Sequence, residues 1–128
     1  MEEKEKREAI ARYASLQIKL EALLKQREEL IERIEEIEET LEALKEVKEN
    51  VNSVFSLGSG AYCFGKIESK KVLVNVGSNV LIEMDKEKAI ETLEKRRTTI
   101  YNLVQEIEKQ SISLISEQQE IAKKIKGA

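Results

Sequence analysis

Apolar residues recur at alternating intervals of three and four positions over residues 4–53. In a heptad lettered a to g, the d positions are all apolar: Leu16, Leu23, Leu30, Ile37, Leu44 and Val51. The a positions are Tyr13, Leu20, Arg27, Ile34, Leu41 and Lys48. An apolar seam sustained over this many heptads predicts a coiled-coil helix for residues 4–53.

A second stretch of the same periodicity covers residues 86–126. Its d positions are Leu93, Ile100, Ile107, Leu114 and Ile121, and its a positions are Ile90, Arg97, Val104, Ser111, Gln118 and Ile125. Asp85 precedes it as a natural N-cap, and Glu87 suits the positive first turn of a helix. We therefore expect a second coiled-coil helix over residues 86–126.

Residues 54–84 have a different pattern, in which β-branched and aromatic residues alternate with polar ones. Gly58-Ser59-Gly60 and Gly77-Ser78-Asn79 have the composition of tight turns, and residues 68–71 separate the two stretches. One strand face gathers Val72, Val74 and Val76, and another gathers Val80, Ile82 and Met84. The pattern predicts two successive β-hairpins over residues 54–84.

These elements predict a single domain over residues 1–128, mainly α with a small β hub, in which two β-hairpins join a long antiparallel two-helix coiled coil. Residue i of the first helix is expected to face roughly residue 140 − i of the second, with the first dozen residues overhanging. Isolated hairpins are marginal in water, so the strands should be completed into a barrel by other subunits. The expected oligomer interface consists of Val72, Val74, Val76, Val80 and Ile82.

Composition argues against an enzyme. The chain is 41% apolar and 37% charged, and it has no His and a single Cys, Cys63. His-dependent catalysis and the usual metal sites are therefore not expected, and no cofactor or metal is predicted. Residues 60–66 match the spacing of a phosphate-binding loop, but Ile67 follows where a magnesium-binding Ser or Thr is required.

Charge and hydropathy bear on the partners. The net charge is −3, and no segment has the basic excess that neutralises a phosphate backbone, so nucleic acid is not an expected partner. No apolar run approaches the roughly 18 residues needed to cross a bilayer, so no membrane partner is expected either. A cytoplasmic location fits these features.

The order of hairpin and helix-entry features resembles the α-class subunit of archaeal prefoldin over nearly the whole chain. The residues that carry the resemblance are Leu57-Gly58-Ser59-Gly60, Gly65-Lys66-Ile67, residues 71–78, Lys88-Ala89-Ile90 and Leu93-Glu94-Lys95-Arg96. The family usually has a Val-Pro step before the first Gly, where this chain has residues 54–57. The resemblance implies a hexamer with β-class prefoldin subunits, two α and four β, whose coiled-coil tips hold unfolded client proteins without ATP and deliver them to a group II chaperonin.

Apolar residues leave the strict seam toward the free ends of the coil, where Arg27, Ser111 and Gln118 interrupt it. Two interpretations account for this equally well. The first is a wider apolar helix face or a stutter in the coil, and the second is a tip that splays and presents apolar surface. Under the second interpretation, the client-binding residues are Ile10, Tyr13, Leu16, Ile18, Ile121 and Ile125. The alternative function for the whole chain is a structural coiled-coil scaffold or filament-forming protein.

Overall fold

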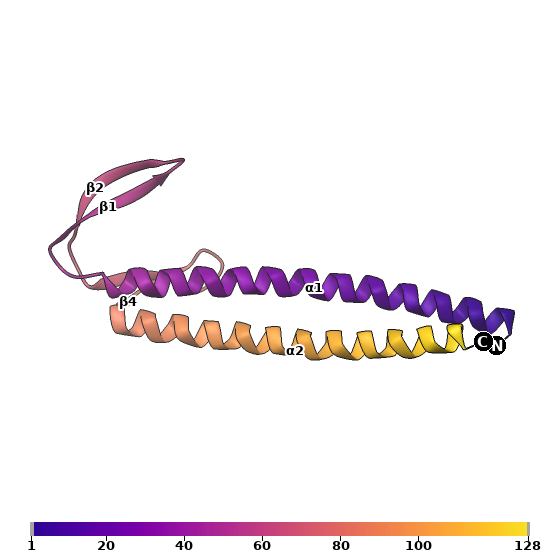
Figure 1. Ribbon diagram of the computed structural model, residues 1–128. Helices are drawn as coiled ribbons and strands as arrows, with labels where there is room; N and C mark the ends of the chain where they lie inside the picture. The colour runs from indigo at the N-terminus through magenta and orange to yellow at the C-terminus, as the bar shows by residue number, and fades with distance from the viewer. Residues whose placement is uncertain (1, 128) are drawn as a thin grey trace. The chain divides into compact units, whose positions relative to one another are not determined.

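The computed structural model describes residues 2–127, which form two long helices and two β-hairpins (Figure 1). In chain order the elements are α1 (Glu3–Lys45), β1 (Val51–Gly58), β2 (Ala61–Ile67), β3 (Lys71–Asn75), β4 (Leu81–Asp85) and α2 (Lys86–Lys126). The predicted fold class of two long helices and two hairpins is confirmed. The second helix begins directly after Asp85, as expected from the capping residue.

The first helix ends at Lys45, eight residues before the predicted end at residue 53. Its last turn tightens, because the Val47 N–H donates to the Leu44 carbonyl rather than to the fourth residue back. The Lys86 ammonium donates to the carbonyls of Lys45 and Val47, at 3.2 and 3.1 Å. A cation at these carbonyls also complements the negative end of the helix dipole. The seam pattern that continues to Val51 therefore passes into a strand.

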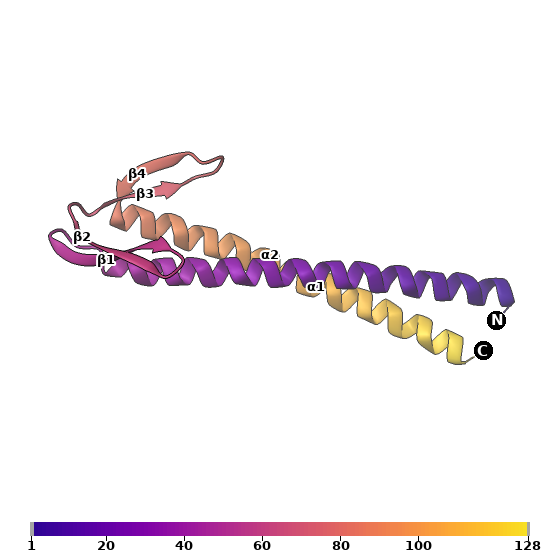
Figure 2. The ribbon, with the colours of Figure 1, turned by 90° about the horizontal axis from the view of Figure 1, so that it is seen from above.

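Two separate antiparallel sheets of two strands each follow, which Figure 2 shows as distinct ribbons. In the first, Val54 pairs with Phe64 and Phe55 with Cys63, and the turn lies at residues 58–60, all with positive φ. In the second, Val74 pairs with Ile82. Its turn at residues 77–79 also has positive φ throughout. The Asn75 side chain accepts the Gly77 N–H at 2.8 Å, which is the local bond that makes Asn common in turns.

The chain packs as two compact units. The helical unit consists of residues 2–34 and 98–127, and the hairpin unit of Glu35–Arg97. The hairpin unit has an apolar core of Leu41, Leu44, Val74, Ala89 and Leu93. Partly buried apolar residues pack against this core: Ile37, Val47, Val72, Met84 and Ile90.

In the helical unit the two helices run antiparallel, and their register differs from the predicted one. Arg12 pairs with Glu117 at 3.0 Å and Arg27 with Glu108 at 3.0 Å. Both partners lie nearer the start of α2 than expected, by roughly one heptad on average. The expected overhang of the first dozen residues is therefore wrong, since Arg12 already has a partner on α2. The cause is the early end of α1, which brings the return of the chain forward.

Candidate binding surfaces

The seam of the helical unit is closed. Its buried apolar residues are Leu16, Leu20, Val104 and Ile107, and two polar residues, Ser111 and Gln118, are buried among them. The Ser111 hydroxyl donates to the Ile107 carbonyl at 2.8 Å. The Gln118 amide donates to the Gln17 side chain at 3.1 Å and to the Tyr13 carbonyl at 3.3 Å. The polar residues thus find partners inside the seam, which is closed as far toward the free ends as Leu16 and Gln118.

The six residues predicted to bind clients lie in three different environments. Leu16 is completely buried, with 0% of its surface exposed, so it packs in the seam of its own chain. Ile121 and Ile125 are partly buried. Ile10, Tyr13 and Ile18 are exposed, Ile18 at 69%. Whether these residues bind clients stays a prediction, but Leu16 offers no surface for it in this structure.

A small apolar hollow brings some of these residues together. It has a volume of about 220 Å³ and is lined by Ile10, Tyr13, Ala122, Ile125 and Lys126. Ile18 is not part of it, because it lies at an outer heptad position, away from α2. The hollow is a place where an apolar side chain from another molecule can insert next to the seam.

The five residues predicted to form the oligomer interface also divide. Val74 is 8% exposed and packs, with Val72, in the core of the hairpin unit. Val76, Val80 and Ile82 are exposed. Two of the five therefore contact the helices of their own chain. A role in subunit contacts stays a prediction for the exposed three.

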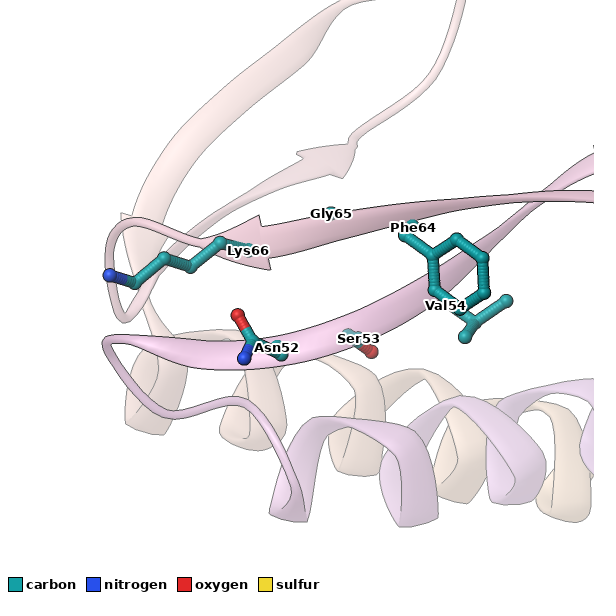
Figure 3. A pocket seen from close by; sticks show the side chains of 6 residues that line it. All are labelled: Asn52, Ser53, Val54, Phe64, Gly65 and Lys66. Atoms are coloured by element: carbon teal, nitrogen blue, oxygen red, sulfur yellow. The ribbon is translucent and has the colours of Figure 1, made fainter.

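Sequence reasoning named no residue of the first hairpin as a candidate contact, although this hairpin exposes large apolar residues. Val54, Tyr62 and Phe64 lie on one face of the β1–β2 ribbon, and Phe64 is 93% exposed. A hollow of about 650 Å³ on this ribbon is lined by Asn52, Ser53, Val54, Phe64, Gly65 and Lys66 (Figure 3). Phe55 and Leu57 are exposed as well. The available signal was the alternation of apolar residues over positions 54–64, which marks two faces but does not say which is covered.

One carboxyl group, that of Glu91 on α2, has a lowered pKa. The ammonium of Lys95 lies 3.0 Å from Glu91 and that of Lys88 lies 3.7 Å away, so these two cations hold the pKa of Glu91 below its usual range. Glu91 lies on the exposed surface of α2, so this shift marks helix pairing rather than a reactive group. Within residues 2–127, no cluster of three or more His, Cys, Asp or Glu is placed to hold a metal ion.

The sequence of this chain matches the profile of a known protein family. The sequence profile of the family described as Prefoldin subunit matches residues 16–127. The chain belongs to the prefoldin family. Prefoldin is a family of chaperones and not of enzymes, so membership implies a chaperone subunit.

Two solved prefoldin structures share the fold. A filamentous PFD from Methanocaldococcus jannaschii has a TM-score of 0.72 at 24% identity, covering 92% of this chain and 98% of that one. The prefoldin beta subunit from Thermococcus strain KS-1 has a TM-score of 0.67 at 14% identity, covering 96% and 90%. At these identities the likeness concerns the fold alone. Among curated protein sequences, none matches significantly. Within the described residues, neither helix is apolar over a length that would cross a membrane.

Proposed function

We propose that this prefoldin-family chain is an α-class subunit that holds non-native proteins without ATP and delivers them to a group II chaperonin in the cytoplasm. The observation that carries the proposal is the exposed apolar surface beside a closed seam in the helical unit. An apolar surface without a shaped, polar-lined pocket suits clients that share exposed apolar groups and no common sequence. No ATP site is needed for such binding.

The α-class assignment is supported by the number of hairpins. The α class has two hairpins and the β class has one, and this chain has the two pairs β1–β2 and β3–β4. The proposed assembly is a hexamer of two α and four β subunits in which the strands complete barrels. Two-stranded ribbons with exposed apolar residues such as Phe64 and Leu73 need such partners, because open edges and apolar faces invite pairing.

Aggregation of a denatured model protein tests the holding function. The chain, assembled with a single-hairpin β-class subunit, is expected to suppress light scattering by the denatured protein without ATP. Transfer is tested separately, by adding a group II chaperonin and following a labelled client from one complex to the other. Suppression without transfer would restrict the function to holding, and no suppression would contradict the proposal.

A structural scaffold is the second candidate, because the similar structure from Methanocaldococcus jannaschii is of a filamentous PFD. A filament and a closed hexamer differ in how mass depends on concentration. The scaffold function predicts that the chain alone forms assemblies of indefinite length that grow with concentration. The chaperone function predicts one fixed mass when the β-class partner is present. Native mass measurement and electron microscopy distinguish the two.

A further inference from the structure

The helices of the helical unit carry an apolar face that is wider than the seam between them. The seam uses the a and d positions, but the e positions of both helices also carry large apolar residues: Ile10, Leu24, Ile31, Tyr101 and Ile115. Apart from Leu103, the g positions carry charged or amide side chains. A strict coiled coil uses a and d alone, whereas the helices of a four-helix bundle add one neighbouring position. The helical unit therefore has the pattern of half a four-helix bundle.

The e positions of the two helices lie on one side of the seam. This side, together with the neighbouring b positions, is called the e flank. Ile10 and Ala122, both at e positions, line the same hollow, and Gln17 at another e position bonds across the seam to Gln118. Residues seven positions apart lie on one face of a helix, so the e flank continues along both helices.

The opposite flank differs in its chemistry. Polar side chains of Lys19, Gln26 and Gln110 border its hollow of about 510 Å³, and Leu23 and Leu114 in that hollow are seam residues. The apolar surface there comes mainly from the seam itself. The e flank is the side on which large apolar side chains project beyond the seam.

On α2 the e flank is symmetric about its own midpoint. Ile112 and Ile115 lie at the centre, Tyr101 lies eleven positions before Ile112, and Lys126 lies eleven positions after Ile115. If a second copy packs antiparallel about this midpoint, Ile112 of each copy meets Ile115 of the other, and Lys126 meets Tyr101. The Lys126 ammonium can then lie over the aromatic ring, which is a favourable cation–π contact.

Positions on α1 repeat this symmetry at the same level. Ala14 and Leu24 are equidistant from position 19, and so are Arg7 and Ile31. Ion pairs from positions 12 and 27 of α1 to positions 117 and 108 of α2 bracket the midpoints of both helices. One two-fold axis therefore serves both helices, and it places Leu24 of each copy on Ala14 of the other.

The charges of the e flank favour the antiparallel arrangement. Arg7 and Lys126 lie toward the free ends of the helices, and Glu21 and Glu28 lie on the same face of α1 as Arg7, two and three heptads further in. Within residues 2–127, Arg7, Glu28 and Lys126 take part in no ion pair. In an antiparallel pair, Arg7 lies within about one helical turn of Glu28 of the other copy. In a parallel pair, the cations of both copies gather at one end and repel.

We infer that the e flank is a self-pairing surface, on which a second copy of this chain packs antiparallel to complete a four-helix bundle. The hollow of about 220 Å³ beside Lys126 then receives Tyr101 of the second copy. A two-fold contact requires a surface that complements itself, whereas an unrelated occupant has no need of such symmetry. The inference goes beyond the proposed function. The paired state covers apolar surface to which that function assigns client binding, so pairing and holding compete.

Concentration-dependent mass tests the inference in the full-length chain. One pair of flanks is a weak contact, but assemblies that carry several coils gain avidity, so pairing should grow with concentration. The flank variant is Ile112→Gln with Ile115→Gln, and the control variant is Leu103→Gln with Ile18→Gln, which removes two exposed apolar residues elsewhere on the same unit. Sedimentation velocity over a concentration series measures pairing, and circular dichroism checks folding.

The wild type and the control variant are expected to gain mass alike as concentration rises. The flank variant should pair roughly tenfold more weakly or worse and keep the smaller mass. Growth that persists unchanged in the flank variant would assign it to another surface and overturn the inference. Equal losses in both variants would overturn it too.

Cross-linking tests the antiparallel geometry with the large apolar residues of the flank left in place. In a Cys63→Ser background, Gln105→Cys with Ala122→Cys lie at symmetric positions about the midpoint of α2. They are about 25 Å apart in one chain, so mild oxidation can join them only between two copies. The control, Asn102→Cys with Lys123→Cys, lies on the outer face of α2. Mass spectrometry should find the bond between positions 105 and 122 and little bonding in the control. Equal yields from the two pairs, or no bond between positions 105 and 122, would contradict antiparallel pairing.

Aggregation suppression separates this inference from the proposed function. If the assembly suppresses aggregation of a denatured protein but its mass does not grow with concentration, the inference fails and the holding function stands. If the flank variant loses suppression while no pairing is seen in the wild type, the flank belongs to clients and the inference fails. If pairing occurs and nothing is suppressed, the proposed function fails and the inference stands.

Discussion

Leu16 and Ile18 are two positions apart but have opposite environments. Leu16 lies at a d position and is completely buried, whereas Ile18 lies on the outer face of α1. Sequence reasoning grouped both as client contacts because both are apolar and near the free end. Heptad position separates them, and it was available from the sequence. Apolar residue type and a position near the free end therefore did not predict which way each side chain points.

Leu16→Ala is expected to destabilise the helical unit by about 3 kcal/mol, because it removes buried methyl groups and leaves a cavity. Ile18→Ala is the matched control and should change stability by less than about 0.5 kcal/mol. Chemical denaturation followed by circular dichroism measures both. Equal effects of the two substitutions would mean that Leu16 is not in the seam.

Gly65 illustrates a residue whose importance is visible only in three dimensions. A Cβ at this position would lie 2.6 Å from a ring carbon of Phe55, which is closer than side chains pack. The ring covers the glycine across the β1–β2 ribbon, a known way to protect a strand glycine. The sequence places a glycine in a strand but does not reveal the aromatic residue above it.

Gly65→Ala is therefore expected to destabilise the hairpin unit by about 1 kcal/mol, since the Phe55 ring must move. The same substitution made in a Phe55→Ala background should cost much less. A double-mutant cycle by thermal melting measures the coupling between the two positions. Additive effects would show that the ring does not cover the glycine in solution.

At the scale of elements, the type and order of the helices and strands were predictable from the sequence. The end of α1 was not, because Lys48 and Val51 continue the heptad pattern past the true end at Lys45. At the observed end, the Lys86 ammonium bonds to the carbonyls of Lys45 and Val47, and Asn50 further along has a left-handed φ. Shifting the register by one heptad keeps every a and d position in the seam. Apolar periodicity therefore could not detect the error.

Polar residues distinguish the two registers. In the observed register Arg12 faces Glu117, and Gln118 meets Gln17. One heptad further along, Arg12 would face Lys124, and Gln118 would meet Leu24. Like charges and an unpartnered buried amide both disfavour that alternative. Pairing of polar residues across the seam was the sequence signal that could have corrected the register.

Cross-linking tests the register directly. In a Cys63→Ser background, Arg12→Cys with Glu117→Cys should be joined within one chain by a short bifunctional thiol reagent. The pair Arg12→Cys with Lys124→Cys should react little, because seven residues of helix, or about 10 Å, separate Lys124 from Glu117. Mass spectrometry of the digested product identifies the bond. Preferential cross-linking of the second pair would contradict the observed register.

At the scale of the whole molecule, each unit exposes its own apolar surface. The hairpin unit exposes Phe64 and Leu73 on two different ribbons, and the helical unit exposes Ile10, Leu24 and Ile115. Of the residues named from the sequence as surface contacts, Leu16 and Val74 are buried by the chain itself. Amphipathic patterns identify faces without saying which face the chain covers by itself. Val74 shows this most clearly, since its valine-rich face turned inward.

Assembly should depend on the exposed hairpin residues, whereas Val74 should affect the stability of the chain itself. Phe64→Asp is expected to reduce the mass of the assembly while leaving helicity intact, because it charges a surface that a partner must cover. Val74→Ala should lower the melting temperature of the chain itself, by roughly 4–8 °C per kcal/mol lost. Native mass spectrometry and circular dichroism measure the two effects. An unchanged assembly mass for Phe64→Asp would exclude this ribbon from the interface.

The central claim is that the helical unit holds non-native proteins without ATP. Light scattering of a denatured model protein, in the presence of the assembly with its β-class partner, tests it most directly. Intact subunits should suppress the scattering, because several weak apolar sites on one assembly can raise avidity by roughly 10² to 10⁴. An assembly with the same number of subunits, in which every subunit lacks its coil tips (residues 1–18 and 120–128 in this chain), should suppress it much less. Equal suppression by the intact and the shortened assemblies would contradict the claim.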